Sequence, residues 1–315
     1  MATSDAVRRV RRLIDVTVVV AFLLVVVGGV VRVSDAGLGC GPAGSGLRGW
    51  PLCNGRLVPI AHVHSVIEYT HRALATVLVL LVLAILWEAL RRFRGERMFV
   101  AGAIAAALLV VVQAVLGALT VEYGLSSALV AAHLGTAMLL LGVLIGLSAA
   151  TRPRRPASSP ALRTVAALAC ALLLATIVAG GVIAGTERHG TPGGEVSEGA
   201  HLACGKEFPT CNGSFLPFGG EMVDIQLAHR VAMFLAVAAI AAFALLLHRR
   251  RAGRLPLAIG AVLAAQVLLG AMNVWFGEHA WLVVAHLAVA TLLWMLVAAA
   301  TASIALATPR AVRAG

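Results

Sequence analysis

The sequence is poor in charged residues, because Asp, Glu, Lys and Arg together make up only 12% of its 315 residues. Soluble domains carry roughly 25% charged residues, so this composition excludes an ordinary soluble globular domain. Apolar residues fill the chain instead: 60% of the residues are hydrophobic, and the mean hydropathy is +0.95. Such a composition is typical of an integral membrane protein.

Apolar stretches long enough to cross a membrane recur eight times along the chain. About 20 residues at ~1.5 Å rise per residue cross a hydrocarbon core of ~30 Å, and a helix satisfies its own backbone hydrogen bonds there. We expect membrane-spanning helices at about 13–33, 66–90, 98–120, 126–149, 162–185, 223–247, 255–276 and 280–306. The sequence therefore predicts an all-α membrane protein with eight transmembrane helices.

Acidic residues are scarcer than basic ones, at 14 against 25, which leaves a formal net charge of +11. Nucleic-acid-binding proteins also carry such an excess, but here eighteen basic residues lie in five places that eight spans would put on one side of the membrane. They are Arg8, Arg9, Arg11, Arg12, Arg91, Arg92, Arg94, Arg97, Arg152, Arg154, Arg155, Arg163, Arg249, Arg250, Arg251, Arg254, Arg310 and Arg313. Basic loops face the cytoplasm. We therefore expect a cell (inner) membrane protein with both termini cytoplasmic, lipid around it and no nucleic-acid partner.

The chain repeats itself. The loop text WPLCNGRLVP (50–59) returns as FPTCNGSFLP (208–217), and IEYTHR (67–72) returns as IQLAHR (225–230), both at an offset of 158. Further matches, at slightly different offsets, are the glycine pairs 28–29 and 180–181, QAVLGAL and QVLLGAM from 113 and 266, and VAAHLGTAMLL and VVAHLAVATLL from 130 and 283.

The first apolar run, after RRVRR, also has the form of a signal peptide, but the return of its VVVGGVV ending as IVAGGVI favours a membrane span.

Four spans per repeat give both copies the same orientation, related by an axis along the membrane normal. The sequence thus predicts two tandem, pseudo-two-fold-related four-helix bundles. We expect an N-terminal bundle at 1–150, a cytoplasmic linker rich in Pro, Ser and Arg at 151–163, and a C-terminal bundle at 164–315.

Four histidines lie inside predicted spans, namely His71, His133, His229 and His286, and they form two repeat-related pairs. An imidazole inside a membrane is costly and usually serves a function. Each ring lies one to two turns from the outer end of an even-numbered span, so two facing helices can hold a haem iron from both faces. A hydrogen bond to a neighbouring helix is the simpler explanation for a single histidine, and zinc would need further ligands. We predict one haem between His71 and His133 and another between His229 and His286, both in the outer half of the membrane.

Arginine follows one histidine of each pair, as Arg72 and Arg230. Either side chain could bind a haem propionate or extend to lipid headgroups. Glu68 lies three residues before His71, on the same helix face, and could accept a proton or stabilise positive charge. The second copy has Gln226 there, which indicates chemistry in the N-terminal half; the alternative is drift after a duplication.

Cysteines number only five. Cys40, Cys53, Cys204 and Cys211 lie in outer loops, where an oxidising compartment permits disulfides. Two loop pairs and one remaining thiol, the buried Cys170, fit that count.

These features together resemble the haem A synthase family. The resemblance covers the whole chain and rests on GLGC…WPLCNG…P, IEYTHR, Q…LG, the four span histidines and a cysteine-bearing loop in each half. It implies an oxidoreductase that converts a methyl group of haem o to a formyl group, by two successive oxidations, giving haem A for haem-copper terminal oxidases. It also implies haem o synthase and oxidase assembly factors as partners, while a homo-oligomer stays open.

The resemblance assigns roles to matching positions. His71 and His133 would hold the substrate haem, Glu68 would be required for its oxidation, and His229 and His286 would bind haem b. Cys40 would pair with Cys53 and Cys204 with Cys211, although the first pair is thirteen residues apart where the family typically has seven. Two other functions remain: a di-haem b-type electron-transfer cytochrome, which leaves the difference between Glu68 and Gln226 unexplained, and a haem carrier or chaperone for oxidase assembly.

Overall fold

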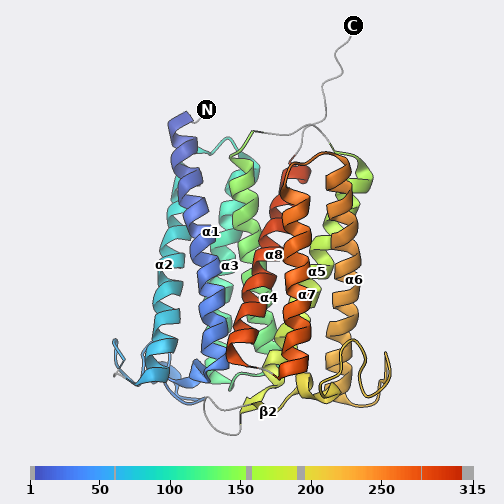
Figure 1. Cartoon of the computed structure of the whole chain (residues 1–315). Coiled ribbons are helices and arrows are strands. Elements are labelled where there is room, and N and C mark those ends of the chain that lie inside the picture. The colour runs from blue at the N-terminus through green and yellow to red at the C-terminus, as the bar shows by residue number, and fades with distance from the viewer. Residues whose placement is uncertain (1–3, 60–61, 154–157, 190–195, 278, 307–315) are drawn as a thin grey trace.

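The computed structural model describes residues 4–59, 62–153, 158–189, 196–277 and 279–306. In these residues eight helices run the length of the molecule (Figure 1). They are α1 (Ser4–Val33), α2 (Val63–Arg92), α3 (Arg97–Glu122), α4 (Ser127–Ala150), α5 (Pro160–Thr186), α6 (Glu221–Arg249), α7 (Leu255–Phe276) and α8 (Ala280–Ala305). All eight are long and apolar enough to cross a membrane. The predicted all-helical fold is confirmed, and the chain is a multi-pass membrane protein.

Several helices extend beyond the apolar runs that predicted them, because polar residues can continue a helix once it leaves the hydrocarbon. Helix α1 begins at Ser4 instead of residue 13. Helix α5 begins at Pro160, inside the predicted linker. The hydroxyl of Ser159 accepts a hydrogen bond from the Leu162 N–H at 3.4 Å, and proline suits the first helical position because its missing N–H would have no helical partner.

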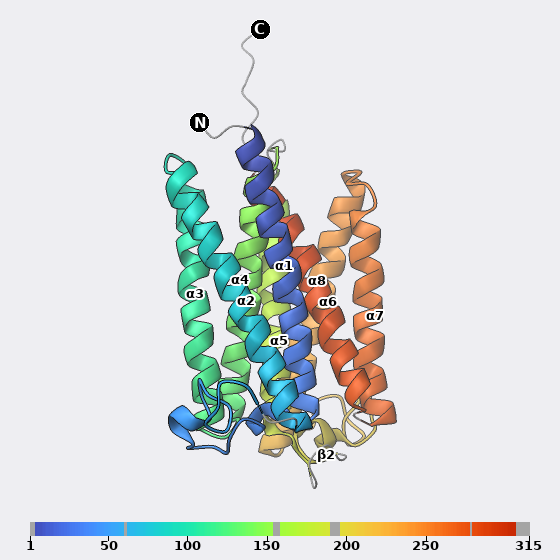
Figure 2. The ribbon, with the colours of Figure 1, turned by 90° about the vertical axis from the view of Figure 1, so that its left-hand side faces the viewer.

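The contacts between helices form two groups of four. Helices α1 to α4 pack in sequence, and α4 returns to α1; helices α5 to α8 pack in sequence, and α8 returns to α5. The groups meet where α4 contacts α5 and α8, and where α1 contacts α8. Figure 2 shows α3 at one flank and α7 at the other, with α1, α4, α5 and α8 between them. The pseudo-two-fold relation between the groups stays a prediction.

The second glycine of each glycine pair lies at the junction between the groups. A Cβ on Gly29 of α1 would lie 2.7 Å from the Leu287 side chain of α8. A Cβ on Gly181 of α5 would lie 3.1 Å from the Ala131 Cα and 3.3 Å from the Leu134 side chain of α4. Each glycine therefore lets its helix approach the fourth helix of the opposite group, at the residue that follows a predicted haem-binding histidine.

A buried hydrogen bond also joins the two groups. The indole N–H of Trp294 in α8 donates to the carbonyl of Met138 in α4 at 2.9 Å. Gly142 leaves room for this ring, since a Cβ there would lie 3.2 Å from it. An indole buried in apolar surroundings needs such a partner, so this contact specifies how α4 and α8 pack.

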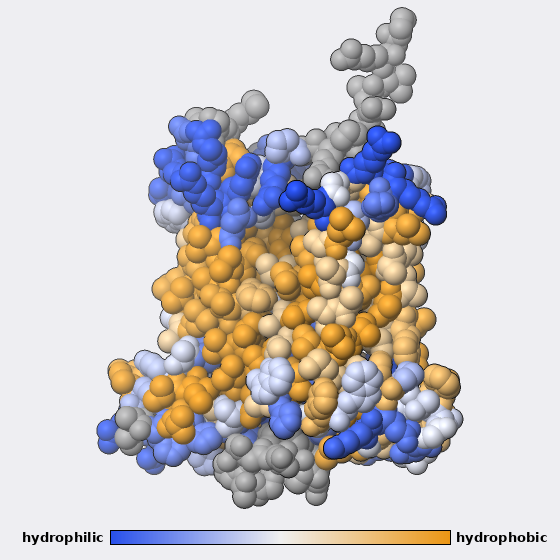
Figure 3. Space-filling model, in the orientation of Figure 1, coloured by the Kyte–Doolittle hydropathy of each residue, from blue (hydrophilic) through white to orange (hydrophobic). Residues whose placement is uncertain are grey.

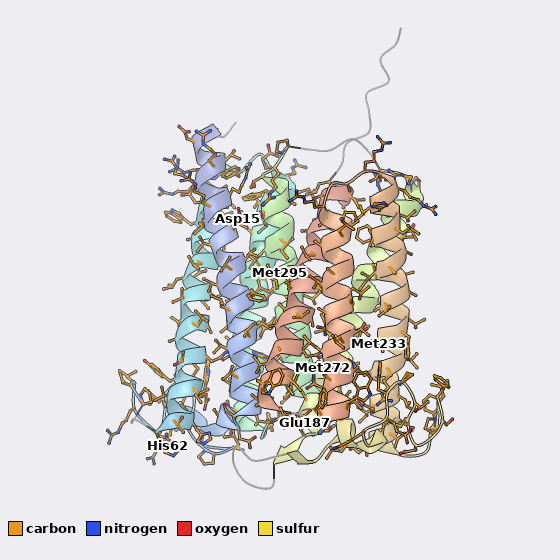
Figure 4. The ribbon with its side chains drawn as sticks, viewed as in Figure 1. Asp15, His62, Glu187, Met233, Met272 and Met295 are labelled. Carbon is orange, nitrogen blue, oxygen red and sulfur yellow. A yellow bond between two sulfur atoms is a disulfide. The ribbon has the colours of Figure 1, made fainter. Side chains whose placement is uncertain are left out.

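The two ends of the bundle differ. We call the end where α1 finishes and α2 begins the loop end; it carries the short helices η1 (Ala36–Leu38), η2 (Gly46–Arg48) and η3 (Ala200–Cys204) and the antiparallel strands β1 (Arg188–His189) and β2 (Val196–Glu198). His62 and Glu187 lie at this end and Asp15 lies toward the other (Figure 4). The visible face has an apolar middle and hydrophilic residues at both ends (Figure 3), as expected for a protein that crosses a bilayer.

Candidate functional site

The four span histidines lie on the four even-numbered helices, in two repeat-related pairs. His71 of α2 and His133 of α4 lie close enough to interact electrostatically, and so do His229 of α6 and His286 of α8. All four even-numbered helices begin at the loop end, within nine residues of their histidines. Each group of four helices therefore carries two interacting imidazoles near the loop end.

A glycine on the preceding odd-numbered helix lies behind each ring. A Cβ on the glycine would meet the Cε1 atom of the histidine at 3.2 Å for Gly28 and His71, and at 3.3 Å for Gly180 and His229. The other two distances are 3.5 Å for Gly117 and His133 and 3.0 Å for Gly270 and His286. Each odd-numbered helix thus leaves room at one glycine for the imidazole of the helix that follows it.

The ring nitrogens have few partners among the described residues. The Nδ1 atoms of His71, His133 and His286 are buried and have no hydrogen-bond partner. His229 differs, because its Nδ1 atom lies 3.1 Å from the carbonyl oxygen of Thr176 in α5. A carbonyl accepts a hydrogen bond, so Nδ1 of His229 carries the proton and its Nε2 atom is free to bind a metal.

These residues fit a haem better than a bare metal ion. Two imidazoles from separate helices match the axial ligands of a bis-histidine haem, and the glycines beside the rings and the unpartnered Nδ1 atoms are consistent with rings held for an additional partner. Within the described part of the chain, His, Cys, Asp and Glu side chains nowhere gather in groups of three or more that could hold a metal ion. A zinc site would require such a group.

Glu68 lies at the edge of the first histidine pair. Its residue is 3% exposed, and its Oε2 atom accepts a hydrogen bond of 2.7 Å from the backbone N–H of Cys40. Its Oε1 atom forms an ion pair with the Arg72 guanidinium. Gln226 is buried at the matching position in α6, where its Oε1 atom has no hydrogen-bond partner in the described residues. The carboxylate is thus fixed in one half, while its amide counterpart in the other half is not.

Both candidate propionate arginines bind outer-loop carbonyls. Nη1 of Arg72 donates to the carbonyls of Gly49 and Leu52 at 2.7 and 3.0 Å. Arg230 donates to the carbonyls of Glu207 and Thr210 at 2.9 and 2.6 Å. These two carbonyl pairs occupy matching positions in the repeat, at the offset of 158. The arginines therefore hold the cysteine-bearing loops onto the bundle, and their contact with propionates stays a prediction.

The predicted cysteine pairs are both present as disulfides, Cys40–Cys53 and Cys204–Cys211, with sequence separations of 13 and 7. The longer first loop contains η2 and returns its chain, so that Asn54 N–H donates to the Cys40 carbonyl at 2.7 Å. Cys170 is a free thiol 3.4 Å from the Thr301 hydroxyl. The disulfides lie at the loop end, and the first is joined to Glu68 through Cys40.

Sequence reasoning missed two sets of residues around the histidines. One set is the four glycines behind the rings, and the other is Gln113 and Gln266, whose amides reach the backbone or ring of a histidine. The motif Q…LG contained the signal: each glutamine precedes its glycine by four residues, so both lie on one helix face. The sequence does not show which side chains this helix face contacts, because that depends on how the helices pack.

Comparison with known proteins gives the family of the chain. A relative from Halalkalibacterium halodurans named "Heme A synthase" is 30% identical over 65% of this chain and 65% of its own length. Relatives of the same name from Bacillus pumilus and Shouchella clausii are 34% and 27% identical, over 42% and 82% of this chain and 44% and 83% of their own lengths. The chain thus spans less than two thirds of the first two relatives. The family model of the cytochrome oxidase assembly proteins COX15-CtaA matches residues 11–298. The chain belongs to the COX15-CtaA family of cytochrome oxidase assembly proteins.

Proposed function

We propose that this protein is a haem A synthase, which oxidises a methyl group of haem o to the formyl group of haem A for haem-copper terminal oxidases. The observation that carries the proposal is the buried carboxylate of Glu68 beside the His71–His133 pair, against Gln226 beside the other pair. Membership in the family and the names of the relatives support it. A cytochrome that only transfers electrons, or a carrier, would have no need of a carboxylate at one haem alone.

In this proposal the N-terminal half holds the substrate. His71 and His133 ligate the iron of haem o, and Glu68 lies one turn from His71 on the same helix face. Arg72 and the Cys40 N–H fix the carboxylate, so that it can accept a proton from the methyl carbon or stabilise the positive charge that develops as electrons leave.

The two histidine ligands of the substrate iron also suggest the source of the oxygen in the formyl group. Two histidine ligands leave no coordination position open on the substrate iron. In each of two successive steps the carbon would lose two electrons and two protons and gain a water molecule's OH and H, with both ligands kept in place. The electrons would leave one at a time through the second haem to an external electron acceptor. Loss of water from the hydrated carbon then leaves the formyl group.

The C-terminal half is the expected site of the haem b cofactor, held by His229 and His286. When bound, this haem would supply one-electron transfer away from the substrate. The chain's own residues would orient the ligands: the Thr176 carbonyl accepts the Nδ1 proton of His229, and Gly180 and Gly270 leave room for the rings of His229 and His286. Gln226, lacking charge, leaves this half without an acid at the matching position.

We further propose that the protein lies in the cell (inner) membrane with both termini in the cytoplasm. The arginine-rich helix ends lie opposite the loop end, and basic loops face inward. Both haem sites would then lie in the outer half of the membrane, under the disulfide-bearing loops. Haem o synthase and oxidase assembly factors are the partners expected to deliver haem o and receive haem A.

The experiment that tests the function is a reciprocal exchange at the matched positions. Cells that make haem o express the parent, Glu68→Gln or Gln226→Glu, and the haems extracted from each membrane are separated and weighed by mass spectrometry. We expect haem A from the parent and from Gln226→Glu. From Glu68→Gln, which keeps the shape but loses the charge, we expect haem o or a hydroxylated intermediate. The same haem b and haem o in all three, with no haem A, would support the electron-transfer cytochrome instead.

A further inference from the structure

Two glutamines at matching positions of the repeat have different partners in the structure. Gln266 of α7 places its Nε2 atom 3.2 Å from the Nε2 atom of His286. Gln113 of α3 places its Nε2 atom 2.8 Å from the backbone carbonyl of His133 and 2.7 Å from the Thr136 hydroxyl. One amide therefore covers the ring nitrogen of its histidine, and the other is turned away from it.

A single residue explains this difference. Thr136 lies three residues after His133, and its hydroxyl donates to the Ala132 carbonyl at 2.7 Å, which leaves the oxygen free to accept from Gln113. The matching position in α8, at the offset of 153, is Val289, which offers no acceptor. The Gln266 amide must then find another acceptor, because a buried donor without one is costly. The nearest is the imidazole nitrogen.

The Gln266 amide thus lies against the Nε2 atom of His286, while its own Oε1 atom is buried without a hydrogen-bond partner among the described residues. Nε2 is the ring nitrogen through which a histidine can bind a metal. Gln266 and a haem iron would thus compete for one nitrogen. No hydrogen bond reaches a ring nitrogen of His133 among the described residues, and its Nδ1 atom is buried without a partner.

We propose that Gln266 is a cap on His286 that an incoming haem must displace, and that Thr136 keeps Gln113 from capping His133 in the same way. This inference rests on the proposed function, in which the C-terminal haem is resident and the N-terminal haem is exchanged at every turnover. A cap on the resident site delays insertion only once. A cap on the substrate site would slow every cycle, and the hydroxyl of Thr136 prevents it.

The test measures haem uptake by apoprotein in detergent micelles, with ferric haem b as the probe and the bis-histidine absorption band as the signal in stopped flow. A background with His71→Ala and His133→Ala isolates the C-terminal site. In it, Val289→Thr supplies the missing hydroxyl and draws Gln266 away, so uptake should be about three- to tenfold faster, the factor that one net hydrogen bond represents. Val289→Ala changes the side chain without adding an acceptor and should keep the parental rate. Equal rates for Val289→Thr and Val289→Ala would overturn the proposal.

The reverse exchange tests the N-terminal site, in a background with His229→Ala and His286→Ala. Thr136→Val frees Gln113 to cover His133 and should slow uptake about three- to tenfold, while Thr136→Ser keeps the hydroxyl and should restore the parental rate. If a background does not fold, ¹⁵N spectra of histidine-labelled apoprotein with all four histidines present give the second reading. Val289→Thr should move the Nε2 resonance of His286 away from its hydrogen-bonded position, and an unmoved resonance would refute the cap.

The outcome is separable from that of the proposed function, because neither measurement requires haem A to form. Uptake without a bis-histidine band would overturn the ligand assignment and with it the cap. A normal band with rates unaffected by residue 289 or residue 136 would overturn the cap and leave the synthase proposal in place.

Discussion

Placing a methyl group on the glycine behind each histidine should reduce haem binding in an order that the structure sets. The Cβ of alanine would lie 3.0 Å from Cε1 of His286 in Gly270→Ala and 3.2 Å from Cε1 of His71 in Gly28→Ala. It would lie 3.3 Å from His229 in Gly180→Ala but 3.5 Å from His133 in Gly117→Ala. The last distance is ordinary van der Waals contact, whereas at 3.0 Å the ring must move by a few tenths of an ångström.

Movement of that size matters because metal–ligand distances vary by only about 0.2 Å. Changes in the residues that orient metal ligands cost about 10- to 100-fold in affinity. We therefore expect Gly270→Ala to lower haem b affinity at least about tenfold, Gly180→Ala to lower it less, and Gly117→Ala to leave its own site close to the parent.

Haem content per protein after purification, by the pyridine haemochrome spectrum, and affinity from titration of apoprotein measure the effect. Gly146→Ala in α4 is the control, because its Cβ meets nothing within 4 Å. Alanine is favoured over glycine in a helix by about 1 kcal/mol, so loss of haem in a variant of equal or higher thermal stability identifies the ring contact as the cause. Equal haem loss in Gly117→Ala and Gly270→Ala would refute the reasoning.

Two further predictions concern the junction and the chemistry. Trp294→Phe removes the hydrogen bond to the buried Met138 carbonyl and should lower the free energy of unfolding by about 1–3 kcal/mol. Denaturation in detergent measures this loss, and Trp87→Phe, at an exposed position, is the control. Equal stability of the two variants would contradict the role of Trp294 at the junction. Turnover in H₂¹⁸O should place the label in the first hydroxylated product, which mass spectrometry can detect before the formyl group exchanges its oxygen with solvent. If the label came from ¹⁸O₂ instead, electron withdrawal with both histidines bound to the iron would be contradicted.

The spans, the repeat, the four histidines and the special position of Glu68 could all be predicted from the sequence, because each depends on local patterns. A membrane segment must be apolar over its whole length, so its position is written in consecutive residues. A histidine within such a segment stands out for the same reason. In the structure the two histidines of each pair interact electrostatically, and Cys40–Cys53 forms despite the longer loop.

The partners of long polar side chains could not be predicted, because they depend on which helices pack together. The sequence predicts that Arg72 and Arg230 bind propionates or extend to lipid, and it does not indicate that both also bind loop carbonyls about twenty residues earlier in the chain. The sequence shows the two glycine pairs, but it does not show that their members have different contacts. The first glycine of each pair lies against a histidine of its own half, and the second lies against a helix of the opposite half.

The sequence by itself determined that this is an eight-span membrane protein with two histidine pairs and one unmatched acid. Only the tertiary structure decided that Gln113 turns to Thr136 while Gln266 covers His286. A threonine and a valine of nearly the same shape occupy matching positions on α4 and α8. Their difference becomes visible once α3 lies against α4 and α7 against α8, because a hydroxyl redirects an amide only when the two helices bring them within hydrogen-bond distance.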